Sequence, residues 1–245
     1  MDPAAAGRMR RRRKLDGVLV LALDTSTDAV VAGLVELAAS NGDGAPRVLA
    51  ERLRTGPRQH GEQLMPAVLQ VCEAAGVRPV ELDALVCGVG PGPFTGLRVG
   101  IVSAAAFADA LGLPAYGVCS LDGIAAAAGS PDPLLVVTDA RRREVYWAAY
   151  GGGARRRHGP AVDAPAALAA RVAELGVRRV AGTMAAELAE PLGLPVHPVI
   201  APTAAGLVAA AAPLLFSGIA APLEPCYLRR PDAVPPVARK RVSVG

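Results

Sequence analysis

The expected order of strands and helices is repeated in the two halves of this 245-residue chain. Each half shows three strand-like segments, a helix, a further strand and a further helix. Each half also opens with a hairpin whose first strand ends in an acid, Asp24 in the first half and Asp139 in the second. Strands that alternate with helices form sheets covered by helices, with ligand loops at the strand ends. The repeat therefore predicts an α/β protein of two similar lobes, whose hairpin turns face each other across a cleft.

Apolar periodicity and turn residues set the bounds of these elements. In the first half the expected strands are 18–24, 29–37, 47–54, 84–89 and 115–118, and the expected helices are 61–75 and 94–111. In the second half the expected strands are 134–139, 144–150, 158–162, 179–182 and 196–199, and the expected helices are 165–175, 185–192 and 203–216. Asp163 is a candidate cap for the helix at 165–175. We place the first lobe at residues 17–118 and the smaller second lobe at 119–228, and the helix 203–216 is a candidate to return to the first lobe.

Basic residues are concentrated at the two ends of the chain. Residues 1–14 hold six Lys/Arg and one Asp, and residues 229–245 hold five Lys/Arg and one Asp, although the net charge of the whole chain is only +4. We expect tails at 1–16 and 229–245 that are either solvated or attract nucleic acid non-specifically. No apolar run reaches the roughly 18 residues that span a bilayer, and no signal peptide is evident. We therefore expect a cytoplasmic protein without a membrane partner.

Small residues recur at every fourth position through the loop and helix that follow the strand at 84–89. They are Gly92, Gly96, Gly100, Ala104, Ala108 and Gly112. At 3.6 residues per turn they form one stripe without large side chains, which lets another backbone come close. We predict that a second protein packs against this stripe, with the chain's own second lobe as the alternative. On this interpretation Gly100→Leu or Ala104→Phe breaks the pairing and leaves the monomer folded.

The helix at 61–75 carries apolar residues on more than one side. They are Leu64, Val68 and Cys72 on one side and Met65 and Leu69 on the other. One side can cover a sheet, whereas the other would be exposed in a monomer, and exposed apolar patches mark partner surfaces. We therefore predict a partner interface made of both helices, comprising Leu64, Met65, Val68, Leu69, Cys72, Gly96, Gly100, Ala104 and Ala108.

The two hairpin turns are the candidate sites for chemistry. Asp24 and Asp139 are placed to hold a hydrated divalent cation, and the hydroxyls and N–H groups that follow Asp24 can cradle phosphates. The residues that we expect to face a nucleotide or phosphate are Asp24, Thr25, Ser26, Gly90, Gly92, Asp139 and Arg141. The alternative, that these polar residues only satisfy tight turns, stays open. The arginine runs at 141–143 and 155–157 either contact phosphate or lie in solvated turns.

Several familiar catalytic motifs are missing from the sequence. The start Gly88-x-Gly90 resembles a dinucleotide fingerprint, but Pro93 stands where its third glycine would fall, and no P-loop motif is present. The three histidines are isolated, and no nucleophile elbow appears. The four scattered cysteines indicate core thiols rather than metal ligands or disulfides. We therefore expect no catalytic residue and no metal site.

Several ordered motifs resemble those of one bacterial family. They are Leu21-Ala-Leu-Asp-Thr-Ser-Thr27, Arg58-Gln-His-Gly-Glu-Gln-Leu-Met-Pro66, Gly88-Val-Gly-Pro-Gly-Pro-Phe-Thr-Gly-Leu-Arg98, Tyr116-Gly-Val-Cys-Ser-Leu121, Thr138-Asp-Ala-Arg-Arg-Arg-Glu-Val-Tyr-Trp147 and Tyr227-Leu-Arg229. Together they span about residues 18–230 and resemble the TsaB (YeaZ) family. The resemblance implies a duplicated two-lobe fold of the actin-like ATPase and sugar-kinase class.

The resemblance also implies a role in tRNA modification. TsaB is the non-catalytic partner of TsaD, which transfers a threonylcarbamoyl group to the adenosine beside the tRNA anticodon, and the ATPase TsaE joins them. The family implies association through the helices at 61–75 and 94–111, with TsaD or as a homodimer, and contact with tRNA through the complex. No cofactor is certain; ATP or ADP with Mg²⁺ at or near the partner interface stays open.

One stretch departs from the catalytic relatives. TsaD-type chains bind a metal through histidines after the strand that follows the second long helix, but here that stretch reads Cys119-Ser-Leu-Asp-Gly-Ile124. We therefore expect this chain not to be an enzyme on its own. The alternative function is an ATP-dependent small-molecule kinase of the same fold, for which the adenosine loop would be the thin candidate Val180-Ala-Gly-Thr-Met184. A metallopeptidase is disfavoured because metal ligands are not clustered.

Overall fold

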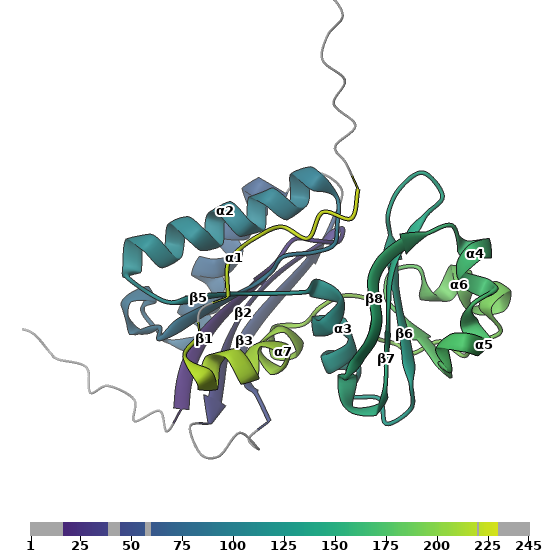
Figure 1. Cartoon of the computed structure of the whole chain (residues 1–245). Coiled ribbons are helices and arrows are strands. Elements are labelled where there is room, and N and C mark those ends of the chain that lie inside the picture. The colour runs from purple at the N-terminus through teal and green to yellow at the C-terminus, as the bar shows by residue number, and fades with distance from the viewer. Residues whose placement is uncertain (1–16, 39–44, 57–59, 220, 230–245) are drawn as a thin grey trace, which may run out of the picture.

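The computed structural model describes residues 17–38, 45–56, 60–219 and 221–229 and has two lobes, each built on one sheet (Figure 1). The predicted tails at 1–16 and 230–245 lie outside the described residues. The first sheet has the order β3-β2-β1-β4-β5. Its strands are β1 (Gly17–Asp24), β2 (Ala29–Ala38), β3 (Arg47–Thr55), β4 (Ala84–Gly88) and β5 (Ala115–Val118). The first three strands are antiparallel neighbours, whereas β4 pairs parallel with both β1 and β5.

The alternation of side chains along β1 determines what covers each face of the first sheet. Leu19, Leu21 and Leu23 point to one face and pack with the helices α1 (His60–Ala75) and α2 (Phe94–Leu111). Val20 and Ala22 point to the opposite face and pack with α7 (Ala204–Ser217). Both faces are buried, which is why β1 and β2 are apolar except for Asp24 and Glu36 and do not alternate with polar residues.

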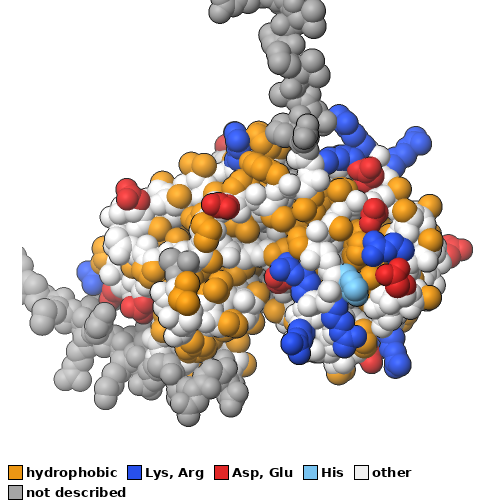
Figure 2. Space-filling view, in the orientation of Figure 1, with side chains coloured by type: hydrophobic (Ala, Val, Ile, Leu, Met, Phe, Trp, Pro, Cys, Tyr) orange, Lys and Arg blue, Asp and Glu red, His pale blue; other side chains and the backbone are white. Residues whose placement is uncertain are grey.

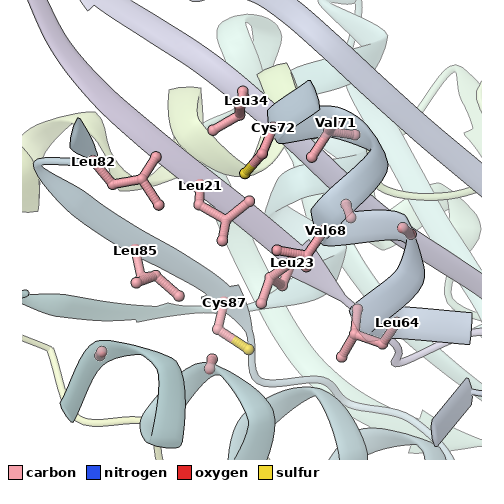
Figure 3. Packing of buried hydrophobic residues seen from close by; sticks show 14 of the residues in the cluster. Leu21, Leu23, Leu34, Leu64, Val68, Val71, Cys72, Leu82, Leu85 and Cys87 are labelled. Carbon is pink, nitrogen blue, oxygen red and sulfur yellow. The ribbon is translucent and has the colours of Figure 1, made fainter. Parts of the chain in front are cut away.

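Large aliphatic side chains fill the core between α1 and the first sheet. In Figure 3 the α1 side chain Cys72 lies beside Leu34 and Leu21 of the strands, and Val68 lies beside Leu23. Leu64 belongs to the same cluster at its Leu23 end. Leu85 and Cys87 of β4 close the cluster toward α2, and Leu64 and Leu85 are fully buried. The inner side of α1 is therefore an ordinary core face.

The second lobe repeats the first at smaller size. Its sheet has the order β8-β7-β6-β9, with β6 (Leu134–Asp139), β7 (Val145–Tyr150), β8 (Arg156–Asp163) and β9 (Arg179–Ala181). As in the first lobe, three antiparallel strands come first, and here one parallel strand follows them instead of two. The helices α4 (Pro165–Ala169), α5 (Val172–Leu175) and α6 (Ala185–Leu192) cover its outer face. The predicted duplicated two-lobe α/β architecture is confirmed.

Two helices join the lobes. α3 (Ser120–Ala128) packs Leu121 and Ile124 against the inner face of the second sheet, and α7 lies on the first sheet. The two helices approach closely because both carry glycine at the crossing: a Cβ on Gly206 would overlap the Gly123 carbonyl oxygen. Short 3₁₀ turns at Pro79–Glu81 (η2) and Gly152–Ala154 (η3) complete the elements.

Several expected elements differ from the structure. Helix α3 was not expected. The helix expected at 165–175 is divided into α4 and α5, and Ala164 rather than Asp163 is its N-cap residue, because the Asp163 carboxylate accepts from Trp147 Nε1 at 2.8 Å. The strand expected at 196–199 is a single bridge between Val196 and Val180. The sequence around Asp163 does not show that Trp147, a distant residue, binds its carboxylate.

The stripe of small residues faces the interior of the chain, which corrects the prediction that a second protein packs against it. Gly96, Gly100, Ala104 and Ala108 are all buried. The Gly100 N–H donates to Thr25 Oγ1 at 3.0 Å, and the Thr25 hydroxyl donates to the Gly96 carbonyl at 2.7 Å. The backbone that comes close is therefore the chain's own first hairpin turn.

One helix among the described residues, α2, is long and apolar enough to cross a membrane by length and composition. No apolar run long enough to span a bilayer was expected from the sequence, because Arg98 and Asp109 interrupt this one. In this structure the small residues of α2 lie against the first sheet.

Gly100→Leu is expected to destabilise the monomer itself. A Cβ at this position would overlap Thr25 Oγ1, so the larger side chain must push α2 away from the turn. We expect the free energy of unfolding in urea to fall by at least about 2 kcal/mol. The matched control is Ala105→Leu on the exposed side of the same helix, which should change it by less than about 0.5 kcal/mol. Equal stability of the two variants would contradict the packing described here.

Candidate functional site

The first hairpin turn, between β1 and β2, is closed by hydrogen bonds within the chain. Asp24 is fully buried, and its Oδ1 accepts from the N–H and the hydroxyl of Ser26, both at 2.8 Å. Its Oδ2 accepts from Ser120 Oγ at the start of α3, at 2.5 Å. Ser120 Oγ in turn accepts from the Gly90 N–H at 3.0 Å. Three segments distant in sequence thus meet at one carboxyl group.

The loop before α2 covers the rest of this turn. Thr25 and Ser26 are 1% and 2% exposed, and Gly90 and Gly92 are buried. A Cβ on Gly92 would overlap the Ser26 carbonyl oxygen, so only glycine allows the loop to lie this close. From the start of α1, His60 Nε2 lies 2.9 Å from the Thr27 carbonyl oxygen. The turn is therefore a packed junction rather than an open edge.

Burial raises the pKa of Asp24 above its ordinary value, although the hydrogen bonds from Ser120 and Ser26 lower it. Burial also raises the pKa of the neighbouring Cys87 thiol, and the charge of Asp24 adds to that rise. The site therefore favours the neutral forms of both groups. A low-dielectric environment of this kind does not favour a strongly charged ligand.

The residues of this turn do not fit a nucleotide with its Mg²⁺. Both carboxylate oxygens of Asp24 are engaged, and a single carbon atom added at Gly88 would overlap Asp24 Oδ2. A hydrated cation is far larger than one carbon atom. The chain's own loop occupies the space beside Asp24, Thr25, Ser26, Gly90 and Gly92, so this arrangement disfavours their facing a phosphate, which stays a prediction.

The second hairpin turn approaches the first from the other lobe. Arg141 pairs with Asp139 on its own turn at 3.0 Å and with Asp28 of the first turn at 3.3 Å. The Arg141 N–H also donates to Asp139 Oδ1 at 2.8 Å. Both partners of the Arg141–Asp28 pair are exposed, so the pair stabilises by about 0–1 kcal/mol. Asp139 and Arg141 thus lie where the two turns meet, and that they face a nucleotide or phosphate stays a prediction.

The outward sides of α1 and α2 each carry exposed apolar residues. Met65 and Leu69 of α1 are 37% and 59% exposed, and Phe94 and Val102 of α2 are 39% and 64% exposed. We call these four residues the helical face. Of the nine residues predicted for a partner interface only Met65 and Leu69 belong to it. The other seven, Leu64, Val68, Cys72, Gly96, Gly100, Ala104 and Ala108, are buried in the chain's own core and cannot contact a partner without unfolding.

A cavity of about 460 Å³ lies on α2 beside this surface, lined by Phe94, Thr95, Arg98, Val99, Val102 and Ser103. The Arg98 guanidinium lies over the Phe94 ring, 4.0 Å from its centroid, and Nε donates to Tyr227 Oη at 2.9 Å. Tyr227 stacks on Phe94 with 5.3 Å between ring centroids. Figure 2 shows hydrophobic side chains on the surface of the first lobe and charged side chains gathered mainly on the second.

Sequence reasoning missed a second cavity, of about 560 Å³, at the seam of α3, α7 and the start of β8. Asp122 and Arg156 line it, and Asp122 Oδ1 accepts from Tyr150 Oη at 2.8 Å and pairs with Arg156 at 3.3 Å. Burial raises the pKa of Asp122, and that of Cys119 to about 12. No local motif marks these residues, because they come from α3, β7 and β8. Among the described residues, no three His, Cys, Asp or Glu are grouped to hold a metal ion.

Fold and site together define a duplicated two-lobe α/β protein of the actin-like and sugar-kinase class, in which the first hairpin turn is closed. Residues 54–177 match the family model described as TsaD, tRNA N6-adenosine threonylcarbamoyltransferase. The chain is 50% identical over 219 residues to an uncharacterized protein of Mycobacterium tuberculosis, covering 88% of this chain and 94% of that one.

Two further comparisons are with proteins that carry a family name. The chain is 35% identical over 134 residues to the tRNA threonylcarbamoyladenosine biosynthesis protein TsaB of Escherichia coli, covering 54% of each. The crystal structure of YeaZ from Pseudomonas aeruginosa aligns with a TM-score of 0.69 at 27% identity, covering 86% of this chain and all of that one. The chain belongs to the TsaB (YeaZ) family of tRNA threonylcarbamoyladenosine biosynthesis proteins.

The isolated chain is expected not to bind ATP with Mg²⁺ at the first hairpin turn, because Asp24 and the loop at Gly88 leave no space there. Titration calorimetry with ATP and Mg²⁺ is the measurement. Stoichiometric binding that Asp24→Asn abolishes, with the variant still folded, would contradict this.

The stability cost of Asp24→Asn is expected to shrink as pH rises. Because the folded pKa is raised, the native chain keeps a proton that the unfolded chain loses above about pH 4. The Asp24 contribution to stability is therefore complete at low pH and is lost as pH rises through the folded pKa. The amide of the variant does not titrate. Urea unfolding from pH 4 to 8 should show that the difference in free energy of unfolding between the wild type and Asp24→Asn narrows as pH rises. The exposed change Asp109→Asn is the control. A difference that widens as pH rises would refute the prediction.

Proposed function

We propose that this chain is the non-catalytic partner of a TsaD-type threonylcarbamoyltransferase subunit in tRNA threonylcarbamoyladenosine synthesis. The observation that carries the proposal is the helical face, Met65, Leu69, Phe94 and Val102, on a member of the TsaB family. Four large apolar side chains are exposed on two packed helices, which a monomer does not need. A partner with a matching helix pair would bury them.

The match to the TsaD family model supports a partner of related shape. The matched residues, 54–177, contain all of α1 and α2. A transferase subunit of that family therefore has segments related to these two helices, and like surfaces on related chains can pair about a pseudo-two-fold axis. The same reasoning applies to a second copy of this chain, so a homodimer through the helical face is the competing assembly.

The state of the first hairpin turn supports a non-catalytic role. The acid and hydroxyl groups there are engaged by one another and buried. In the stretch where TsaD-type chains place metal-binding histidines, this chain has Ser120, whose hydroxyl is used by Asp24. The acid and hydroxyl groups of the turn thus stabilise the fold, and we assign the group transfer to the partner.

The assembly we propose contains this chain, the transferase subunit and a TsaE-type ATPase, and it reaches tRNA through the complex. Any ATP or ADP with Mg²⁺ would be held by residues other than the first hairpin turn, at or near the partner interface. The proposed location is the cytoplasm, where tRNA is modified.

Reconstitution tests the function. Transferase and ATPase subunits, with threonylcarbamoyl adenylate supplied, should modify tRNA at a much higher rate when this chain is present, and this chain alone should modify none. Equal rates with and without it would refute the partner role. Phosphorylation of a small molecule by the isolated chain with ATP would instead support the kinase alternative.

Charge placed on the helical face is expected to break the interaction without unfolding the chain. Leu69→Asp and Val102→Asp put a carboxylate at positions that are 59% and 64% exposed, so stability should change by less than about 0.5 kcal/mol. Burial of that charge at an interface should weaken transferase binding at least about tenfold. Calorimetry measures the affinity, with Ile219→Asp, at a side chain 66% exposed after α7, as the control. Unchanged affinity in both variants would show that the partner binds elsewhere.

A further inference from the structure

The last described residues, 221–229, cross from the first lobe to the second. We call them the C-terminal segment. Ala221 bridges to Tyr116 beside β5, where the Gly117 N–H donates to the Ala221 carbonyl at 3.2 Å. A Cβ on Gly117 would overlap the Pro222 carbonyl oxygen, so the segment lies directly on the edge of β5. Figure 1 shows it running along α2 toward the gap between the lobes.

The far end of the C-terminal segment is held from both sides. The Cys226 N–H donates to the Val89 carbonyl at 2.8 Å, after the end of β4. Arg229 donates to the Ala140 carbonyl at 3.0 Å and forms an ion pair with Glu144, both on the hairpin turn of the second lobe. Tyr227 lies between these two attachments. Its position therefore depends on both lobes.

Tyr227 is itself part of the apolar surface on α2. It is 39% exposed, as is Phe94, on which it stacks. Arg98 lies flat on Phe94 and donates to the Tyr227 hydroxyl, so two rings and a guanidinium form one connected platform. Phe94 and Arg98 line the α2 cavity, which places Tyr227 at its border. Tyrosine and arginine are enriched among residues that dominate binding energies, because they combine apolar area with fixed donors.

We propose that Tyr227 belongs to the docking surface for the transferase subunit, and that Arg229 is a positioning residue that holds Tyr227 there from the second lobe. This inference rests on the proposed function. The docking surface then combines α2 with a segment outside residues 54–177, the part shared with the transferase family. The second lobe supports the interface through the contact of Arg229 with Glu144 and Ala140, without contacting the partner through these residues.

Affinity of the full chain for the purified transferase subunit tests both roles. Tyr227→Ala should weaken binding at least about tenfold. Tyr227→Phe, which keeps the stacked ring and loses the hydroxyl, should weaken it less. Ile200→Ala, at a side chain 56% exposed in the second lobe, is the matched control and should leave affinity unchanged. Thermal unfolding of each variant should match the wild type, since Tyr227 lies at the surface.

A double-mutant cycle separates positioning from direct contact. Arg229→Ala should weaken binding severalfold in the wild-type chain and have no further effect in the Tyr227→Ala chain. In the isolated protein, Arg229→Ala should also speed hydrogen exchange of the Cys226 and Tyr227 amides, which a direct contact with the partner would not require.

Different results would overturn the docking role of Tyr227, the positioning role of Arg229 and the proposed function. Wild-type affinity in Tyr227→Ala would overturn the docking role while the proposed function stands. Independent, multiplying losses from Tyr227→Ala and Arg229→Ala, or unchanged exchange at Cys226 and Tyr227, would overturn the positioning role. No binding by the wild-type chain would overturn the proposed function, and this inference with it.

Discussion

The structure depends on the close packing of the loop before α2 over the first hairpin turn. The buried Asp24 carboxyl group joins β1, the loop at Gly90 and the start of α3, and glycine at 88 and 92 removes the side chains that would keep these backbones apart. Buried polar networks of this kind specify one arrangement when every member is satisfied. Because the turn is filled from within, its polar groups are part of the core.

Because the first hairpin turn is closed, a partner can contact only the outer surface of α2. The inward side of α2 is used by the chain's own turn, so only its outward side is available to a partner. There the exposed apolar residues, the stacked Phe94 and Tyr227, and Arg98 are gathered on two helices and one crossing segment. The polar groups of the first hairpin turn therefore serve the packing of the chain, and the exposed apolar side chains lie on its outer surface.

Much of the fold could be predicted from the sequence, because it follows from local patterns. Apolar periodicity located the strands and helices of the first lobe, and the repeated hairpin ending in Asp24 and Asp139 predicted the duplication. The errors have non-local causes. Asp163 was expected to cap a helix but binds Trp147, and the helix α3 depends on contacts with the second sheet and α7. For the site, the sequence predicted that the two hairpin turns face each other, and Arg141 joins them, whereas the direction of the α2 stripe was predicted wrongly.

A stripe of small residues shows that some backbone comes close, but its sequence does not identify that backbone. The sequence by itself determined the family, the two-lobe plan and which residues on α1 and α2 are apolar or small. Only the tertiary structure decided which of these residues face inward, that the Ser120 hydroxyl donates to Asp24, and that Tyr227 reaches Phe94 from 133 positions away in the numbering. The physical reason is that periodicity defines the faces of a helix, whereas burial of each face depends on segments that are distant in sequence.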